Sequence, residues 1–149
     1  MRCLAWAEDG RAPRTSMSET VLDFCGVDSV EDLITWREAA SKAQVAAVAP
    51  LVVDAAARGD AAANETLAVA VRSLVAHVEA SLEAAGPWDG PAPLVLWGGL
   101  LDAEGPLREQ VTMALGHLDV RLEHHELDPA MGAARLALAK LERSVPNRQ

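Results

Sequence analysis

Apolar residues recur along most of the chain with the spacing of amphipathic helices. They fall at intervals of three and four between residues 41 and 58, and again between residues 60 and 85, which predicts two long helices. Pro50 lies inside the first of these helices and is expected to kink it without ending it. Shorter helices are predicted at residues 1–8, 16–26, 106–115 and 128–143, and another begins at residue 29.

Residues that favour helix N-termini precede several of these segments. Ser16 is followed three residues later by Glu19, which is the spacing of a capping box. Ser29 repeats this spacing with an aspartate, and Asp60 and Asp128 stand at the starts of two further helices. Each of these side chains is expected to accept a hydrogen bond from a free amide of the first turn.

Two segments have the pattern of β-strands. Residues 94–97 are all apolar and lie between Pro93 and Gly98, which indicates a buried parallel strand covered on both faces. Residues 119–124 alternate between apolar and polar, which predicts a half-exposed strand. Two strands alone make a weak sheet, and their open edge is expected to favour self-association. We therefore predict one helix-rich α/β domain over residues 1–149.

The candidate binding site is the glycine pair that follows the first strand. Gly98 and Gly99, with Leu100 after them, lie where the strand gives way to a turn and then a helix. Ligands of open α/β sheets bind at the carboxyl ends of strands, and glycine lets a ligand approach the backbone closely. The alternative is a turn that needs glycine only for its conformation.

Other candidate residues have a structural explanation that we prefer to a functional one. Helix capping accounts for Asp60. Gly132 and the two alanines after it offer a small surface for close helix packing. Trp88 and Trp97 are expected to belong to the core rather than to a ligand site.

Composition and charge narrow the classes of partner. The formal net charge is −9, and the 13 Lys and Arg residues form no basic stripe, which argues against nucleic-acid binding and against tight ATP binding by this chain alone. The sequence has no apolar run of membrane-spanning length and no signal peptide, and Cys3 and Cys25 lack a CxxC spacing, so we expect a cytoplasmic protein without membrane association. His124 and His125 are adjacent on the predicted strand and point to opposite faces, so no metal site is expected.

Four segments together resemble a known family. APLVVDAAARGDAAA, LVLWGG and DPAMGAARLALA occur in the order, and at about the spacing, seen in the C-terminal lobe of N-acetylglucosamine kinases and of BadF/BadG/BcrA/BcrD-type ATPases. Upstream, EDGRAPRTSM is similar to a family loop. The resemblance implies part of an actin-like (RNase H-like) ATPase lobe. It also implies a parent family that binds ATP and Mg between two lobes and transfers the γ-phosphoryl group of ATP to an amino sugar.

Within this resemblance, Gly98, Gly99 and Leu100 match the family's adenosine motif. Nothing in the sequence resembles the N-terminal lobe, its catalytic aspartate or either phosphate loop, so no catalytic or metal-binding residue is assigned. The main hypothesis is therefore a truncated kinase or ATPase that retains the adenosine-binding turn and is inactive alone. The alternatives are a non-catalytic interaction domain that pairs through its open sheet edge, and one half of a split kinase that needs a complementary lobe.

Overall fold

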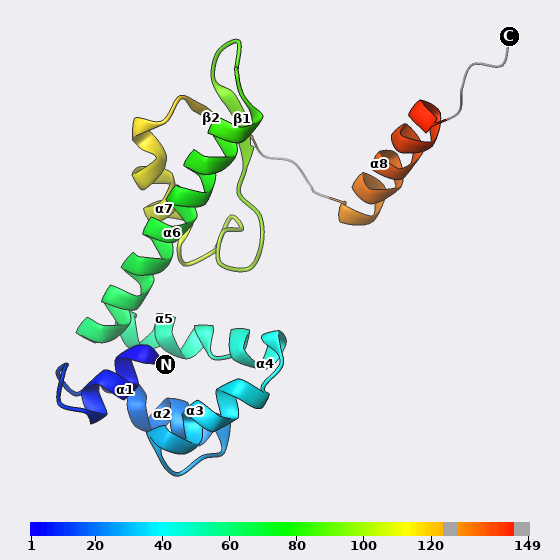
Figure 1. Ribbon diagram of the computed structural model, residues 1–149. Coiled ribbons are helices and arrows are strands. Elements are labelled where there is room, and N and C mark those ends of the chain that lie inside the picture. The colour runs from blue at the N-terminus through cyan, green and yellow to red at the C-terminus, as the bar shows by residue number, and fades with distance from the viewer. Residues whose placement is uncertain (124–127, 145–149) are drawn as a thin grey trace, which may run out of the picture.

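The structure is a computed structural model that describes residues 1–123 and 128–144. The described residues are mainly helical and contain one two-stranded sheet (Figure 1). The elements in chain order are α1 (Arg2–Glu8), α2 (Met17–Cys25), α3 (Val30–Ala39), α4 (Lys42–Ala46), α5 (Ala49–Ala57), α6 (Ala61–Ala85), β1 (Ala92–Val95), α7 (Arg108–Ala114), the 3-10 helix η1 (Leu115–His117), β2 (Val120–Glu123) and α8 (Pro129–Ser144).

The strands β1 and β2 pair in parallel, as the apolar pattern predicted. Their register runs from Ala92 opposite Val120 to Val95 opposite Glu123. β1 begins two residues earlier than expected because the Ala92 amide already donates to the Asp119 carbonyl at 3.0 Å. Within the described residues the pairing ends at Val95, so the expected strand at 94–97 is displaced towards the N-terminus.

The sheet has one covered face and one open face. Leu94, Leu96 and Val120 pack against the buried side chains of α6 and α7. The opposite face carries Arg121 and Glu123 on β2, as the alternation predicted. The expectation that the apolar segment 94–97 is covered on both faces holds only in part, because Val95 on this second face is half-buried and Trp97 is exposed.

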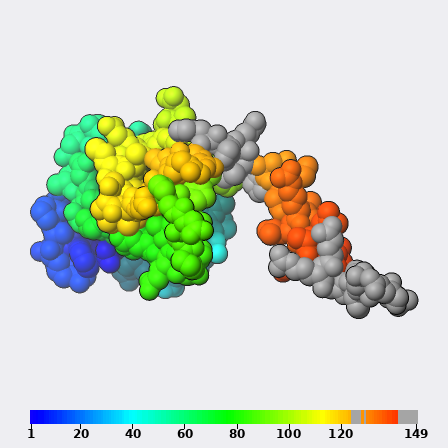
Figure 2. Space-filling model, turned by 90° about the horizontal axis from the view of Figure 1, so that it is seen from above, coloured from blue at the N-terminus to red at the C-terminus, as the bar shows by residue number. Residues whose placement is uncertain are grey.

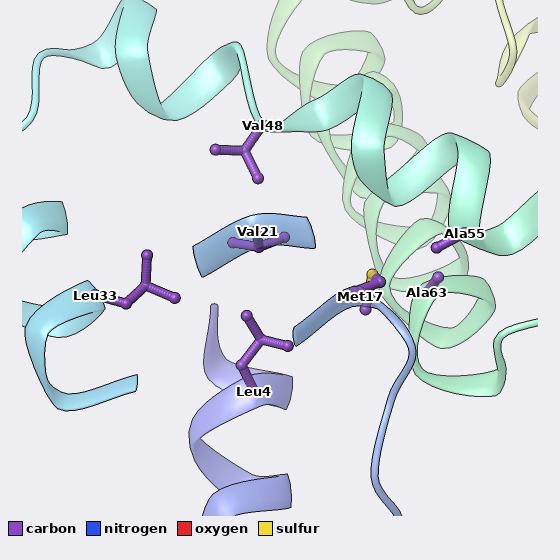
Figure 3. Packing of buried hydrophobic residues seen from close by; sticks show 7 residues of the cluster. All are labelled: Leu4, Met17, Val21, Leu33, Val48, Ala55 and Ala63. Atoms are coloured by element: carbon purple, nitrogen blue, oxygen red, sulfur yellow. The ribbon is translucent and has the colours of Figure 1, made fainter. Parts of the chain in front are cut away.

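Two hydrophobic clusters form the interior, and α6 contributes to both. Figure 3 shows the first cluster, in which side chains of α1, α3 and the residue before α5 surround Val21 of α2, while Met17 lies near Ala55 and Ala63. Its members are Leu4, Met17, Val21, Leu33, Val48, Ala55 and Ala63. The second cluster contains Val71 of α6 with Leu107, Val111 and Leu115 of the α7 segment. The 25 residues of α6 therefore link the N-terminal helices to the sheet.

The predicted helix at 41–58 is two helices in the structure. α4 ends at Ala46, and α5 begins at Ala49 with Pro50 in its first turn. Proline has no amide to donate to the carbonyl four residues earlier, which here belongs to Ala46, and its ring clashes with that carbonyl. In the first turn of a helix, no amide has a partner inside the helix and no earlier turn is present to clash with the proline ring. Pro50 therefore starts a new helix where a kink was expected.

Three of the four predicted helix caps are confirmed. Ser29 accepts from the Asp32 amide at 3.1 Å, and Asp60 and Asp128 each accept from an amide three residues later at 2.9 Å. The Ser16 capping box is wrong, since Ser16 makes no capping hydrogen bond. The Thr15 hydroxyl accepts from the Met17 amide at 3.2 Å instead.

Helix α8 extends away from the other elements (Figures 1 and 2). Every described side chain from Ala130 to Leu138 is exposed, so the small-residue packing expected at Gly132 has no partner in the described chain. The expected strand residue His124, its neighbour His125 and residues 145–149 of the predicted frayed tail lie outside the described residues.

Candidate functional site

The glycine pair lies in a tight turn just after β1. Gly98 has a φ of +108°, a conformation that side chains disfavour, so glycine is required there by the backbone itself. Its amide donates to Asp102 Oδ1 at 2.8 Å, and its carbonyl accepts from the Asp102 amide at 2.9 Å. The Asp102 side chain thereby closes the turn around Gly98.

Gly99 differs from Gly98 because nothing surrounds it. A Cβ placed on Gly99 meets no atom within 4 Å, and its φ is not positive. Its neighbour Leu100 is 39% exposed, and Trp97 on the other side of the pair is 56% exposed. The backbone of Gly99 is therefore open to solvent between two apolar side chains, and a flat ligand can reach it.

A close backbone contact fixes this turn to the start of α7. A Cβ on Gly105 would lie 2.6 Å from the carbonyl carbon and oxygen of Leu100, so only glycine fits without a backbone shift. The Leu107 amide donates to the Leu100 carbonyl at 3.0 Å, and Arg108 Nη1 donates to the Leu101 carbonyl at 2.6 Å. Buried Leu107 then anchors the segment in the second cluster.

The roles of Gly105 and Arg108 were not predicted from the sequence. The helix was expected to begin at residue 106, whereas α7 begins at Arg108. In the residues before the helix, the Leu107 amide donates to the Leu100 carbonyl, and the Arg108 amide closes a turn onto the Gly105 carbonyl. A glycine before a proline indicates a turn, but the contact with Leu100 is a tertiary feature that no local pattern contains.

The charge in the turn disfavours an anionic group as a ligand. Asp102 lies beside the glycine pair, and its carboxylate repels phosphate groups. The bare backbone at Gly99 and the flanking apolar side chains suit a flat, uncharged group. Within residues 98–102, Asp102 is the titratable side chain, and its Oδ1 is held by the Gly98 amide. The turn thus offers binding groups rather than a nucleophile or a base.

Asp60 lies in a second polar cluster and has a structural role. Its Oδ1 accepts from the Ala63 amide at 2.9 Å, while its Oδ2 accepts from Thr15 Oγ1, the Ser16 amide and Ser16 Oγ at 2.7–2.8 Å. Burial raises the pKa of this carboxyl, but the four hydrogen bonds outweigh that effect and lower it from 3.8 to about 2. The carboxylate caps α6 and ties it to the loop before α2.

The remaining candidates are placed as follows. The expectation of core tryptophans is wrong for Trp88 and Trp97, which are 45% and 56% exposed; Trp88 Nε1 donates to the Leu82 carbonyl at 3.1 Å. Cys3 and Cys25 are free thiols, each half-buried.

Among residues 1–123 and 128–144, no group of three or more His, Cys, Asp or Glu side chains is arranged to hold a metal ion. In that same part of the chain, no helix is long and apolar enough to cross a membrane.

Comparison with known proteins relates the chain to sugar kinases, although no protein-family model matches it. It is 28% identical over 144 residues to the N-acetyl-D-glucosamine kinase of Dictyostelium discoideum. It is 26% identical over 138 residues to the N-acetylmuramic acid/N-acetylglucosamine kinase of Clostridium acetobutylicum. These alignments include 93% and 90% of this chain but 45% of each relative.

The chain is therefore a distant relative of N-acetylglucosamine kinases, as the resemblance predicted. It spans less than half the length of the curated relatives it matches. The helix-rich structure with a parallel strand pair agrees with the predicted fold class at this level.

Proposed function

We propose that this chain is the adenosine-contacting part of an ATP-dependent sugar kinase of the N-acetylglucosamine kinase type. The observation that carries the proposal is the solvent-open backbone of Gly99, at the carboxyl end of a parallel strand, in a relative of such kinases. Gly98 shapes the turn, Gly99 lies against the base or ribose, and Leu100 covers one side of the ligand.

The reaction of the parent family requires more than this turn provides. Transfer of the γ-phosphoryl group to a sugar hydroxyl needs groups that hold the phosphates and a base for the hydroxyl. Among residues 1–123 and 128–144, no three or more His, Cys, Asp or Glu side chains are arranged around a common point, so no Mg²⁺ ligand is assigned to this chain. We therefore propose that the chain does not catalyse the transfer alone, and that a complementary lobe supplies the phosphate loops and the base.

Binding of adenosine by the isolated chain tests the proposal directly. Titration followed by amide NMR is expected to shift the signals of residues 98–102, with an affinity no better than about 1 mM, or roughly 4 kcal/mol. Adenosine is the better probe than ATP because its binding does not depend on phosphate contacts.

A matched pair of glycine variants makes the test specific. Gly99→Val places a branched side chain where the ligand is expected to lie and should abolish the shifts. Gly116→Val is the control, because Gly116 is also exposed with nothing within 4 Å of its Cβ position. Equal adenosine binding by both folded variants would leave the glycine pair with a purely conformational role.

A second function, that of a non-catalytic interaction domain, is favoured by one specific observation. α8 carries Met131, Leu138 and Leu141 on one face, and these side chains are 51–63% exposed. They form apolar surface of the kind that binds a partner. Concentration-dependent self-association of the chain distinguishes this function from the first.

A further inference from the structure

A cavity of about 640 Å³ lies between α1, the loop that follows it and the first half of α6. This volume is in the range typical of small-molecule sites, roughly 300–1,000 Å³. Its walls are mainly apolar, with Met1 and Cys3 on one side and Ala62 and Val69 on the other. Residues 98–100 do not line it, so it is separate from the glycine turn.

An aromatic ring with two cations close to it lines the cavity. The guanidinium carbons of Arg2 and Arg11 lie 5.0 and 5.7 Å from the centroid of the Trp6 ring. Stacking of this kind holds planar groups in place at modest entropic cost. Arg11 is also paired with Asp9, so its charge is partly compensated. Trp6 is still 40% exposed, which leaves ring surface available to a ligand.

The rim of the cavity is positively charged although the chain as a whole is acidic. Arg2, Arg11 and Arg14 line it, and in residues 1–123 and 128–144 neither Arg2 nor Arg14 has a carboxylate within ion-pair distance. The carboxylate that lines the cavity belongs to Glu65, whose Oε1 accepts from Arg72 Nη2 at 2.7 Å. Positive charge without a partner is therefore concentrated at this opening, against a net charge of −9.

We propose that this cavity binds a small ligand with a flat apolar body and one anionic group, such as an aryl carboxylate or an aryl phosphate. The body lies against Val69, Ala62 and the Trp6 ring, and the anion contacts the guanidinium groups of Arg2 and Arg14. An apolar wall with a few convergent polar groups at its rim is the usual construction of such a site. The proposal does not depend on the function proposed for the glycine turn.

Two probes of nearly the same shape, one anionic and one neutral, test this assignment. Naphthalene-2-carboxylate and the neutral naphthalene-2-carboxamide have the same shape, and calorimetric titration of the full chain measures both affinities. We expect the carboxylate to bind about tenfold more tightly, the factor that one charge-assisted hydrogen bond supplies. Naphthyl 2-phosphate, run in parallel, shows whether the site favours a carboxylate or a phosphate. Equal affinities of the charged and neutral probes would overturn the proposal.

The arginine variants locate the interaction. Arg2→Gln combined with Arg14→Gln should remove the preference for the anion while leaving carboxamide binding unchanged. Arg37→Gln combined with Arg58→Gln is the control, because it removes the same charge from exposed residues outside the cavity and should keep the preference. Equal loss in both double variants would show that overall charge is responsible, and the assigned cavity would be wrong. Gly99→Val should leave all these affinities unchanged, which separates this site from the adenosine turn.

Discussion

The Ser16 amide donates to Asp60 Oδ2 at 2.7 Å, across 44 residues of sequence. This bond joins the loop before α2 to the first turn of α6, and the hydroxyl groups of Thr15 and Ser16 donate to the same oxygen. A single carboxylate thus caps one helix and fixes the approach to another. Its loss should affect the whole N-terminal helical region.

We expect Asp60→Ala to cost about 2–4 kcal/mol of unfolding free energy, because several donors lose their acceptor together. Ser29→Ala is the control: it removes a cap that has no distant partner and should cost about 1 kcal/mol. Urea denaturation of both variants measures the difference. Equal losses would show that the bonds from Thr15 and Ser16 add nothing to the capping of α6.

The lowered pKa of Asp60 also predicts a pH dependence. The folded-state pKa of about 2 lies below the ordinary value of 3.8, so its stabilisation is complete above pH 3.8 and is lost as the pH falls towards about 2. Asp60→Asn should flatten this part of the stability profile. Denaturation of the parent protein and of Asp60→Asn at several pH values between about 2 and 3.8 checks this prediction. Stability profiles that run parallel in the two proteins would contradict it.

His117 predicts the opposite pH dependence in the C-terminal half. Its Nε2 lies 2.9 Å from Glu79 Oε1 and its Nδ1 lies 2.9 Å from the Ala114 carbonyl, and only the imidazolium donates to both. The hydrogen bond with Glu79, then that with Ala114, raises the pKa of His117 above 6.5. Its stabilisation is therefore complete below pH 6.5 and is lost as the pH rises through the raised value.

Glu79→Gln should bring the pKa of His117 back towards its ordinary value, as measured by NMR titration of the ring protons. Glu83→Gln is the control, because Glu83 is an exposed carboxylate one turn further along α6 and has no bond to His117. If the titration of His117 is unchanged in Glu79→Gln, the hydrogen bond between Glu79 of α6 and His117 of η1 does not raise the pKa of His117.

The close approach at Gly105 makes a prediction that the sequence alone does not offer. Gly105→Ala places a methyl group 2.6 Å from the Leu100 backbone and should destabilise the chain by about 1–3 kcal/mol. Gly116→Ala, with open space around it, should change stability by less than about 1 kcal/mol. Thermal unfolding of the two variants is the measurement, and similar melting temperatures would refute the close contact.

Local patterns were sufficient for elements that depend on local forces. The helical period found α6, and the side chains of Ser29, Asp60 and Asp128 identified their own helix starts, because a cap needs only an amide two or three residues away. The alternation of apolar and polar residues in β2 correctly assigned Val120 and Arg121 to opposite faces of the sheet, because neighbouring side chains in a strand point to opposite faces.

Long-range contacts account for some of the errors. Ser16 has the sequence of a cap, but its hydroxyl donates to Asp60 instead, and that competition cannot be found within α2. The glycine pair was placed correctly at the end of a strand, yet the contact of Gly105 with Leu100 depends on how the loop folds back. The role of Gly98, Gly99 and Leu100 in binding adenosine remains a prediction.

The apolar face of α8 predicts association of the chain with itself. Leu138 is 58% exposed and lies on the same side of the helix as Met131 and Leu141, which repeat at helical spacing. Burying this face against a second copy removes apolar surface from water, and we expect the average mass in sedimentation equilibrium to rise above 15.8 kDa with concentration.

Leu138→Glu should shift this rise to higher concentration. Leu136→Glu is the matched control, because Leu136 is 70% exposed but lies about 200° away around the helix, so the same substitution should have little effect. A monomer at every concentration in the parent protein, or equal behaviour of the two variants, would show that this face does not mediate association.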